Sequence, residues 1–425
     1  MKLNNELVRL VMSNDYIFTK IQDIAISYAG GTPNREKNEY FNGTIPWITS
    51  GEVNQEKITD TKEKISHLGL KYSSAKWIPS SSVLIAMYGA TAGQISYLEI
   101  QATSNQAVLA VIAKKGKINS KYLYYVLKHN KDKILFQAQG SGQANLSKSL
   151  IDNIFIQIVK DDSTQKRIAK ILSTIDGQIE KTEAIIAKYQ TIKQGMLHDL
   201  FTRGIDLSTG KLRPNPEQSP ELYKPSPLGL IPKDWECVKL EKIITKLVHG
   251  GTPSTANTKY WDGDIPWVSG ADFLDNFSIG EIRRHITHNA ILESSCNIVP
   301  KENILLVTRT GVGKLSKTDC TIAISQDITG IIADKNLVSN SWFYYYLQLI
   351  VEDFKKLNQG TSINGILKND LLSKLLMLPS INEQNLIQNK IEIIDNLIKQ
   401  EISILNKNVQ LKNSLIINLL SSKVK

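Results

Sequence analysis

The sequence predicts an α+β protein in which two repeated, mixed α/β domains are separated by two long antiparallel coiled-coil helices. Three observations support this fold class. Apolar residues recur with an average period of 3.5 over two long segments, short motifs of the first half recur 220 residues later, and a proline-rich stretch separates the halves. We place the domains at 1–160 and 233–379, the helices at 161–203 and 380–425, and the linker at 204–232.

The first domain and the second share a framework of short motifs. Gly-Gly-Thr-Pro occurs at 30–33 and 250–253, and Ile-Pro-Trp at 45–47 and 265–267. Short apolar runs bounded by Gly, Ser and Asn predict strands of a mixed sheet. We expect strands at 82–87 and 107–112 with a helix at 120–134, and strands at 303–308 and 328–332 with a helix at 339–357.

The first long helix is predicted by apolar residues at alternating steps of four and three from Gln165 to Arg203, interrupted only by Thr182 and Lys193. The positions expected to pack against a second helix are Ile168, Leu172, Ile175, Ile179, Ile186, Tyr189, Met196 and Leu200. About 37 helical residues span roughly 55 Å. Such a helix is too long to be buried in one ordinary domain, although two separate amphipathic helices remain the alternative.

The ends and glycines of this helix carry further signals. Asp162 followed by Gln165 predicts its start, and Gly204 its end. Gly177 and Gly195 lie inside it, and each costs about 1 kcal/mol of helix propensity relative to alanine. We therefore expect another backbone to approach closely at these glycines.

The second long helix repeats the first with an offset of 219 residues. Ser380 and Glu383 predict a capping box at its start, and Lys412 is a polar interruption that matches Lys193. The expected packing positions are Ile387, Ile391, Ile394, Ile398, Leu405, Leu415 and Leu419. The shared pattern predicts that the two helices pair.

Charge and cysteine content limit the class of protein. Lys and Arg outnumber Asp and Glu by 51 to 41, a net charge of +10 that is compatible with nucleic acid or another anionic surface. The three cysteines form no CxxC pair, so we expect a reducing cytoplasmic location. The polar start of the chain predicts no signal peptide, and no apolar run is long enough to predict a membrane span.

Two partial motifs suggest chemistry that the rest of the sequence does not support. Thr310–Lys314 resembles part of a phosphate-binding loop, but lacks its first glycine and final hydroxyl, so a turn between strands is the better interpretation. His285, His288 and Cys296 lack a fourth metal ligand. We predict no catalytic residues and no metal site.

Basic, amide and aromatic side chains on loops are the candidates for contact with DNA. Such side chains read base edges and hold phosphates. In the first domain they are Lys71, Tyr72, Lys76, Tyr88, Gln94, Gln143 and Asn145; in the second, Arg283, Arg284, Arg309, Lys314, Lys317, Asn364 and Lys368.

This arrangement resembles the specificity subunit of Type I restriction-modification systems over essentially the whole chain. The resemblance is carried by the twin Gly-Gly-Thr-Pro and Ile-Pro-Trp motifs, by Leu230–Glu236 at the entry to the second domain, and by the helix starts at Gln165 and Gln384. Asp15-Tyr16 departs from the family's usual Pro-x-x-Trp at the start of the first domain.

The resemblance implies a non-catalytic subunit whose two domains each read one part of a split, asymmetric target in double-stranded DNA. It also implies two modification subunits docked on the helices and domains, and restriction subunits that join them. S-adenosylmethionine, ATP and Mg²⁺ are then expected in those partners, with no cofactor in this chain. The spacer length is compatible with readers about one DNA turn, 34 Å, apart.

The two halves differ outside the framework, for instance in Arg283–His285 against Lys64-Ile65, which predicts different half-sites. Two other functions stay open. One is the recognition part of a self-contained methyltransferase or restriction enzyme. The other is a coiled-coil scaffold that does not bind DNA.

Overall fold

The structure is a computed structural model that describes residues 16–138, 146–357 and 365–420. The chain divides into two compact units. Unit 1 comprises Met1–Ala184 with Ile402–Lys425, and unit 2 comprises Ile185–Glu401. Each unit therefore contains one globular domain and parts of both long helices.

Unit 1 is built on a five-stranded sheet with the order β2-β9-β6-β7-β4, beside a three-stranded sheet β5-β3-β8 and the pair β1-β10. Strand β8 runs parallel to β3, and β4 to β7, so the sheets are mixed as predicted. The elements are β1 (Tyr16–Lys20), α2 (Ile21–Ile24), β2 (Ala25–Ala29), β3 (Phe41–Ile48), β4 (Lys57–Ile58), β5 (Glu63–Ile65), α3 (His67–Lys71), β6 (Ser82–Ala86), β7 (Ile95–Leu98), β8 (Thr103–Ser104), β9 (Val108–Ala113), α4 (Ser120–His129), α5 (Lys131–Ala138), α6 (Lys148–Asn153) and β10 (Phe155–Val159).

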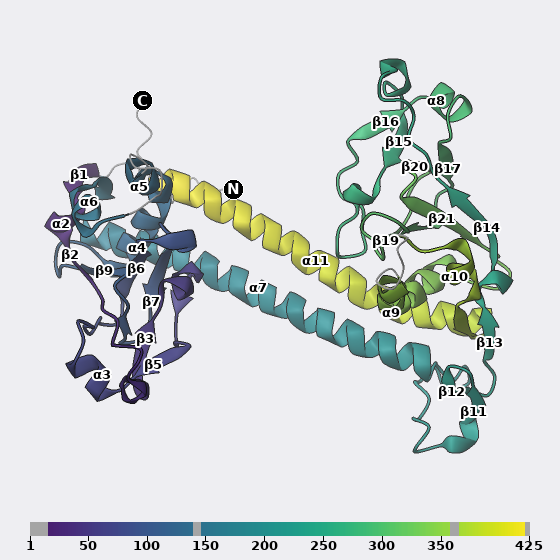
Figure 1. The fold of residues 1–425 in the computed structure, drawn as a ribbon, viewed down its shortest axis with the longest axis horizontal. Helices are drawn as coiled ribbons and strands as arrows, with labels where there is room; N and C mark the ends of the chain where they lie inside the picture. Colours follow the sequence, from purple (N-terminus) through teal and green to yellow (C-terminus); the bar gives the residue numbers. More distant parts are fainter. Residues whose placement is uncertain (1–15, 139–145, 358–364, 421–425) are drawn as a thin grey trace. The chain divides into compact units, whose positions relative to one another are not determined.

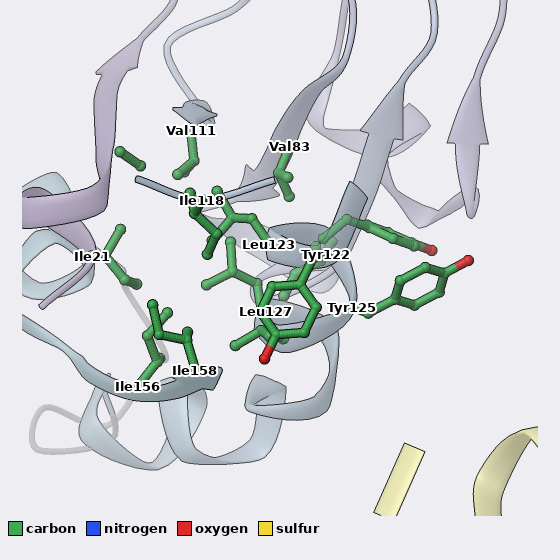
Figure 2. Packing of buried hydrophobic residues seen from close by; sticks show 14 of the residues in the cluster. Ile21, Val83, Val111, Ile118, Tyr122, Leu123, Tyr125, Leu127, Ile156 and Ile158 are labelled. Atoms are coloured by element: carbon green, nitrogen blue, oxygen red, sulfur yellow. The ribbon is translucent and has the colours of Figure 1, made fainter. Parts of the chain in front are cut away.

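The main core of unit 1 lies between its large sheet and helix α4. Figure 2 shows Leu123 and Leu127 of α4 between Val83 and Val111 of the sheet and the β10 side chains. Continuous apolar runs such as β6 are buried on both faces, because a second cluster of apolar side chains covers the opposite side of the sheet.

Unit 2 repeats this plan with a four-stranded sheet β14-β21-β18-β19, a second sheet β16-β15-β20-β17 and the pair β13-β22. Its elements are β13 (Glu236–Lys239), β14 (Ile244–His249), β15 (Ile265–Val268), β16 (Arg284–Ile286), α8 (His288–Leu292), β17 (Asn297–Val299), β18 (Ile304–Val307), β19 (Leu315–Lys317), β20 (Ile322–Ile324), β21 (Ile328–Ala333), α9 (Asn340–Leu357), α10 (Lys368–Ser373) and β22 (Leu375–Leu378). Strand β15 pairs in parallel with β20, as β3 does with β8.

The four predicted strands correspond to β6, β9, β18 and β21, and the predicted helix at 339–357 to α9. The helix predicted at 120–134 divides into α4 and α5 at Asn130. There the Asn130 side chain donates a hydrogen bond to the Val126 carbonyl, at 2.8 Å, and a turn at Asn130 separates the two helices.

The long helices are α7 (Asp162–Thr202) and α11 (Ile381–Leu420), labelled in Figure 1. In unit 1 the beginning of α7 shares a core with the end of α11, and in unit 2 the end of α7 shares a core with the beginning of α11. The helices therefore pair antiparallel, which confirms the predicted fold class.

The glycines of α7 correct one prediction. A Cβ atom built on Gly177 or Gly195 would have no atom within 4 Å, apart from the nearby helix backbone. Within the part of the chain that the structure describes, no backbone approaches either glycine, so the expectation of a close approach is wrong for this chain alone.

The predicted helix starts also need correction. Asp161, not Asp162, caps α7: its carboxylate accepts hydrogen bonds from Ser163 Oγ at 2.5 Å and from Thr164 N at 2.8 Å, and these bonds lower the Asp161 pKa to about 2. At the start of α11, Glu383 N lies 3.4 Å from Ser380 Oγ, but the Glu383 carboxylate turns toward the linker. The capping box predicted there is therefore only half formed.

The linker is folded onto unit 2. It contains a hairpin of β11 (Tyr223–Ser226) and β12 (Gly229–Pro232), and Ile205 and Ile231 are buried in the unit 2 core. Among the described residues, no helix is sufficiently long and apolar to cross a membrane.

Candidate nucleic-acid interface

The Gly-Gly-Thr-Pro turns hold the two sheets of each unit together. Gly31 N donates to Ser104 O at 2.8 Å, and Gly251 N to Ile324 O at 2.9 Å. A Cβ on Gly30 would lie 2.0 Å from Ser104 O, so only glycine allows this approach. The indole of Trp47 donates to Gly31 O at 3.0 Å. Trp267 makes the same bond to Gly251 O at 3.2 Å, which explains why the two motifs recur together.

In each unit, a turn at the end of the main sheet accepts a hydrogen bond from a described residue that follows a Gly-rich segment of the sequence. In unit 1, residues 87–94 connect β6 to β7, and Met87 O accepts a 3.0 Å hydrogen bond from Leu146 N. In unit 2, residues 308–314 connect β18 to β19, and Thr308 O accepts from Ile366 N at 2.8 Å. Leu146 and Ile366 therefore lie beside these turns. The candidates Gln143, Asn145 and Asn364 fall in those segments, outside the described residues.

The second of these turns settles the interpretation of Thr310–Lys314. Val307 N donates to Lys314 O at 2.8 Å, and Gly313 N donates to Val307 O at 3.1 Å. Gly311 and Gly313 have positive φ angles of 87° and 92°. The segment is a tight connection between antiparallel strands, as predicted, and it is followed directly by strand β19, whereas a phosphate-binding loop leads into a helix.

The two turns carry different side chains. In unit 1, Tyr88 is 41% exposed, and Gln94 accepts a 2.9 Å hydrogen bond from Lys131. In unit 2, Arg309 is exposed, whereas Lys314 donates to Phe273 O at 3.0 Å and lies 3.1 Å from Asp275. One turn thus presents an aromatic ring and the other a guanidinium group.

A second candidate surface in unit 1 combines lysines with aromatic rings. Lys71 lies over the Tyr72 ring at 5.4 Å, and Lys76 lies over the Tyr28 ring at 5.9 Å. The Tyr28 hydroxyl donates to Trp77 O at 2.6 Å. Tyr72 is 61% exposed and Trp77 40%. Sequence reasoning missed Tyr28 and Trp77, although a tryptophan beside a lysine in a polar loop was an available signal.

Several basic candidates of unit 2 are engaged within the unit. The Arg284 guanidinium lies 4.3 Å over the Trp267 ring and donates to Asp272 at 2.8 Å. Lys317 donates to Ser341 Oγ at 2.9 Å. These side chains stabilise the domain, and their cationic groups are only partly available to a ligand.

Arg283 and Lys368 are exposed. Arg283 is 3.8 Å from Glu281, and both side chains are mostly in solvent. Lys368 is the first residue of α10, at the position equivalent to Lys148, the first residue of α6. Lys148 forms an ion pair with Asp152, and the corresponding residue in unit 2 is Leu372, so Lys368 lacks that neighbour.

All fifteen expected helix-packing residues are buried or half-buried. The fully buried ones lie near the domains, for example Ile168 and Leu172 in unit 1, and Ile387 and Ile391 in unit 2. Ile186, Tyr189 and Leu405, toward the middle of the helices, are half-buried.

Comparison with known proteins identifies the family. The model of the Type I restriction modification DNA specificity domain matches residues 14–189 and again residues 232–411. The MjaX specificity subunit of Methanocaldococcus jannaschii is 30% identical over 292 residues, which cover 67% of this chain and 63% of that protein. The MjaVIII specificity subunit of the same organism is 23% identical, over 93% of this chain and 89% of that protein.

Solved structures with a similar fold are also found. The crystal structure of a Type I S subunit from M. genitalium matches with a TM-score of 0.65 at 14% identity, over 97% of each chain. A structure described as concerning complex assembly and conformational transition of the Type I system matches with a TM-score of 0.54 at 14% identity, over 96% of this chain and 98% of that chain. With two copies of the specificity domain and this fold, the chain belongs to the family of Type I restriction-modification specificity subunits.

Proposed function

We propose that this chain is the non-catalytic DNA-specificity subunit of a Type I restriction-modification complex, and that each unit reads one half of a bipartite, asymmetric target. The observation that supports the proposal is that both units share the same backbone framework but expose different side chains on it. Both units have the same Gly-Gly-Thr-Pro turn, indole bond and strand pairing. The turns at 87–94 and 308–314 expose Tyr88 in one unit and Arg309 in the other.

These side chains suit different modes of DNA contact. An exposed tyrosine stacks on or packs against bases, and an arginine forms paired hydrogen bonds to guanine or binds phosphate. The lysine-aromatic surface around Tyr72 and Trp77 adds both kinds of contact to unit 1. Two readers that differ in chemistry recognise different half-sites, so the full target is asymmetric.

The proposed partners are double-stranded DNA, two modification subunits and, through them, restriction subunits. S-adenosylmethionine, ATP and Mg²⁺ then belong to the partners. Side chains such as Ile185 and Ile393 on α7 and α11 are exposed apolar groups on which modification subunits can dock. The unread gap between half-sites is set by the spacer helices.

Domain exchange tests this function. Residues 1–160 are replaced by the corresponding domain of a relative, and the chain is expressed with its modification subunits. Sequencing of methylated DNA is expected to show one half-site changed and the other retained. Exchange of residues 233–379 is the matched control and should change the opposite half. If both halves stay unchanged in both exchanges, the modular function is refuted.

Two measurements separate this function from the alternatives. The purified chain should not bind S-adenosylmethionine, whereas a self-contained methyltransferase would. DNA binding by the complex should weaken steeply with salt because phosphate contacts release counterions. A scaffold that does not bind DNA would show no such dependence.

A further inference from the structure

Two polar clusters occur at equivalent places where a domain meets both long helices. In unit 2, Lys193 of α7 lies 2.7 Å from Asp395 of α11, and Tyr345 of α9 donates to the same carboxylate at 2.8 Å. We call Tyr345, Asp395 and Lys193 the unit 2 polar layer. Lys193 also lies over the Tyr345 ring at 5.4 Å.

Unit 1 contains the same arrangement with the helices exchanged. Lys412 of α11 lies 2.6 Å from Asp176 of α7, and Tyr125 of α4 donates to Asp176 at 2.6 Å. These three residues form the unit 1 polar layer. Glu56 extends this layer, because its carboxylate lies 3.5 Å from Lys412.

The groups of both layers are largely removed from solvent. The side chains of Lys193 and Asp395 are 15% and 21% exposed, and those of Lys412 and Asp176 are 13% and 22% exposed. Burial, with the neighbouring Asp176 carboxylate, raises the pKa of Tyr125 far above its ordinary value, so this hydroxyl remains a donor. Burial alone would lower the pKa of Lys412, but Asp176 and Glu56 raise it overall, so the amine stays charged.

The two ion pairs specify the same alignment of the helices. In an antiparallel pair, the numbers of facing residues have a constant sum. The sum is 588 for Lys193 with Asp395 and also 588 for Asp176 with Lys412. One alignment therefore satisfies both layers at once.

A shift by one heptad would keep apolar positions facing apolar positions, but it would disrupt both layers. Asp176 would then face Leu419 or Leu405, according to the direction of the shift. Asp395 would face Leu200 or Ile186. Each carboxylate would lose its lysine beside an apolar side chain, which is strongly unfavourable.

We infer that the two polar layers fix the alignment of the spacer helices with each other and with the recognition domains, and so determine the length of the unread gap in the DNA target. This inference rests on the proposed function. Lys193 and Lys412 are matching polar interruptions of the two heptad patterns, and a buried polar residue at such a position is a known means of specifying alignment. The four charged residues and two tyrosines are positioning residues that need not touch DNA.

The experiment uses the whole complex, expressed with its modification subunits, and sequencing of methylated DNA. Wild type is expected to modify sites with one gap length. The apolar variant Lys193→Leu/Asp395→Leu/Lys412→Leu/Asp176→Leu removes both layers without leaving a charge unpaired. It is expected to remain folded and to modify sites with mixed gaps, because a heptad shift moves a helix by about 10 Å, or about three base pairs.

The charge-exchanged variant Lys193→Asp/Asp395→Lys/Lys412→Asp/Asp176→Lys also carries Glu56→Gln, because Glu56 lies beside position 412. It keeps both ion pairs without placing two carboxylates together and should restore the single wild-type gap. A merely structural role would change methylation yield without changing the gap. The matched control is Lys166→Leu, which removes a solvent-exposed ion pair with Asp162 on α7 and should leave the gap unchanged.

The one-layer variant Lys193→Leu/Asp395→Leu keeps the unit 1 layer and should show a smaller fraction of altered gaps. Folded apolar and one-layer variants that both retain one gap would overturn the inference while leaving the bipartite function intact. A wild-type complex that modifies an undivided sequence would instead refute the proposed function.

Discussion

The two units can be compared most directly at the first turns of their long helices, where each has a buried glutamine. Gln165 of α7 accepts a 2.8 Å hydrogen bond from Asn119 N, and Gln384 of α11 accepts one of the same length from Ser339 N. Both glutamines are buried, and each also donates to the carbonyl of a residue just before its helix. A buried amide therefore joins each domain helix to the start of a spacer helix in the same way.

The two units differ at the residue just before each of these glutamines. Thr164 in unit 1 is partly exposed, and its hydroxyl donates a hydrogen bond to the cap residue Asp161. Its counterpart Glu383 is fully buried and accepts hydrogen bonds from Ile205 N at 2.7 Å and Trp235 Nε1 at 2.9 Å, and forms an ion pair with Arg213. The linker provides Ile205 and Arg213, and Trp235 lies just after it. The asymmetry therefore arises where a segment specific to unit 2 is attached to a repeated framework.

The largest expected effect comes from breaking this buried cluster. Glu383→Ala leaves Arg213 buried without its main carboxylate partner and should destabilise unit 2 by about 3–5 kcal/mol. Hydrogen exchange in α9 is expected to accelerate, with little change in α4. The matched change Thr164→Ala should have a much smaller effect on unit 1. Equal effects of the two substitutions would show that the cluster does not distinguish the units.

Removal of the tyrosine hydroxyls should affect the units equally. Tyr345→Phe and Tyr125→Phe each delete a hydrogen bond to an aspartate, which is worth about 1.5–3 kcal/mol. Hydrogen exchange in α9 and in α4, measured at increasing denaturant concentration, gives the loss of stability in each unit. Tyr88→Phe, at an exposed turn, is the control. A loss confined to one unit would mean that the polar layers are not equivalent.

The helix glycines should give a smaller change of opposite sign. Because nothing in the described chain approaches Gly177 or Gly195, alanine at either position should stabilise the isolated subunit by about 1 kcal/mol. Gly177 lies in the unit 1 part of α7 and Gly195 in the unit 2 part, so the gains should be similar. Calorimetry measures them. Gly30→Ala is the contrasting control, since its Cβ would overlap Ser104 O and should prevent folding of unit 1.

The smallest expected effect distinguishes the two turns that we propose contact DNA. Arg309→Ala in unit 2 should reduce the slope of log affinity against log salt by about 1, because one phosphate contact is lost. Tyr88→Ala in unit 1 should weaken binding without changing that slope. Binding of the assembled complex is measured across a salt series. A slope change for Tyr88→Ala alone would reverse the proposed roles of the turns.

Sequence reasoning predicted the fold because its signals are local and occur twice. The 3.5-residue period of α7 and α11, the strands β6 and β18, and the Gly-Gly-Thr-Pro turns all follow from backbone and burial requirements that short patterns record. The candidate site was harder, because a basic residue has the same appearance in sequence whether it faces solvent or a neighbour. Trp267 and Asp272 lie beside the Arg284 guanidinium and engage it, whereas Arg309 is exposed in a turn.

The sequence by itself determined that there are two domains, two paired helices and one family. It did so because periodicity, glycine geometry and motif order require no knowledge of distant contacts. The tertiary structure alone decided what the polar interruptions do. Lys193 and Asp395 are 202 residues apart in the chain, and only folding shows that this pair and its counterpart in unit 1 obey one alignment. Burial of a charge is favourable only beside its partner, and the position of the partner is a property of the fold.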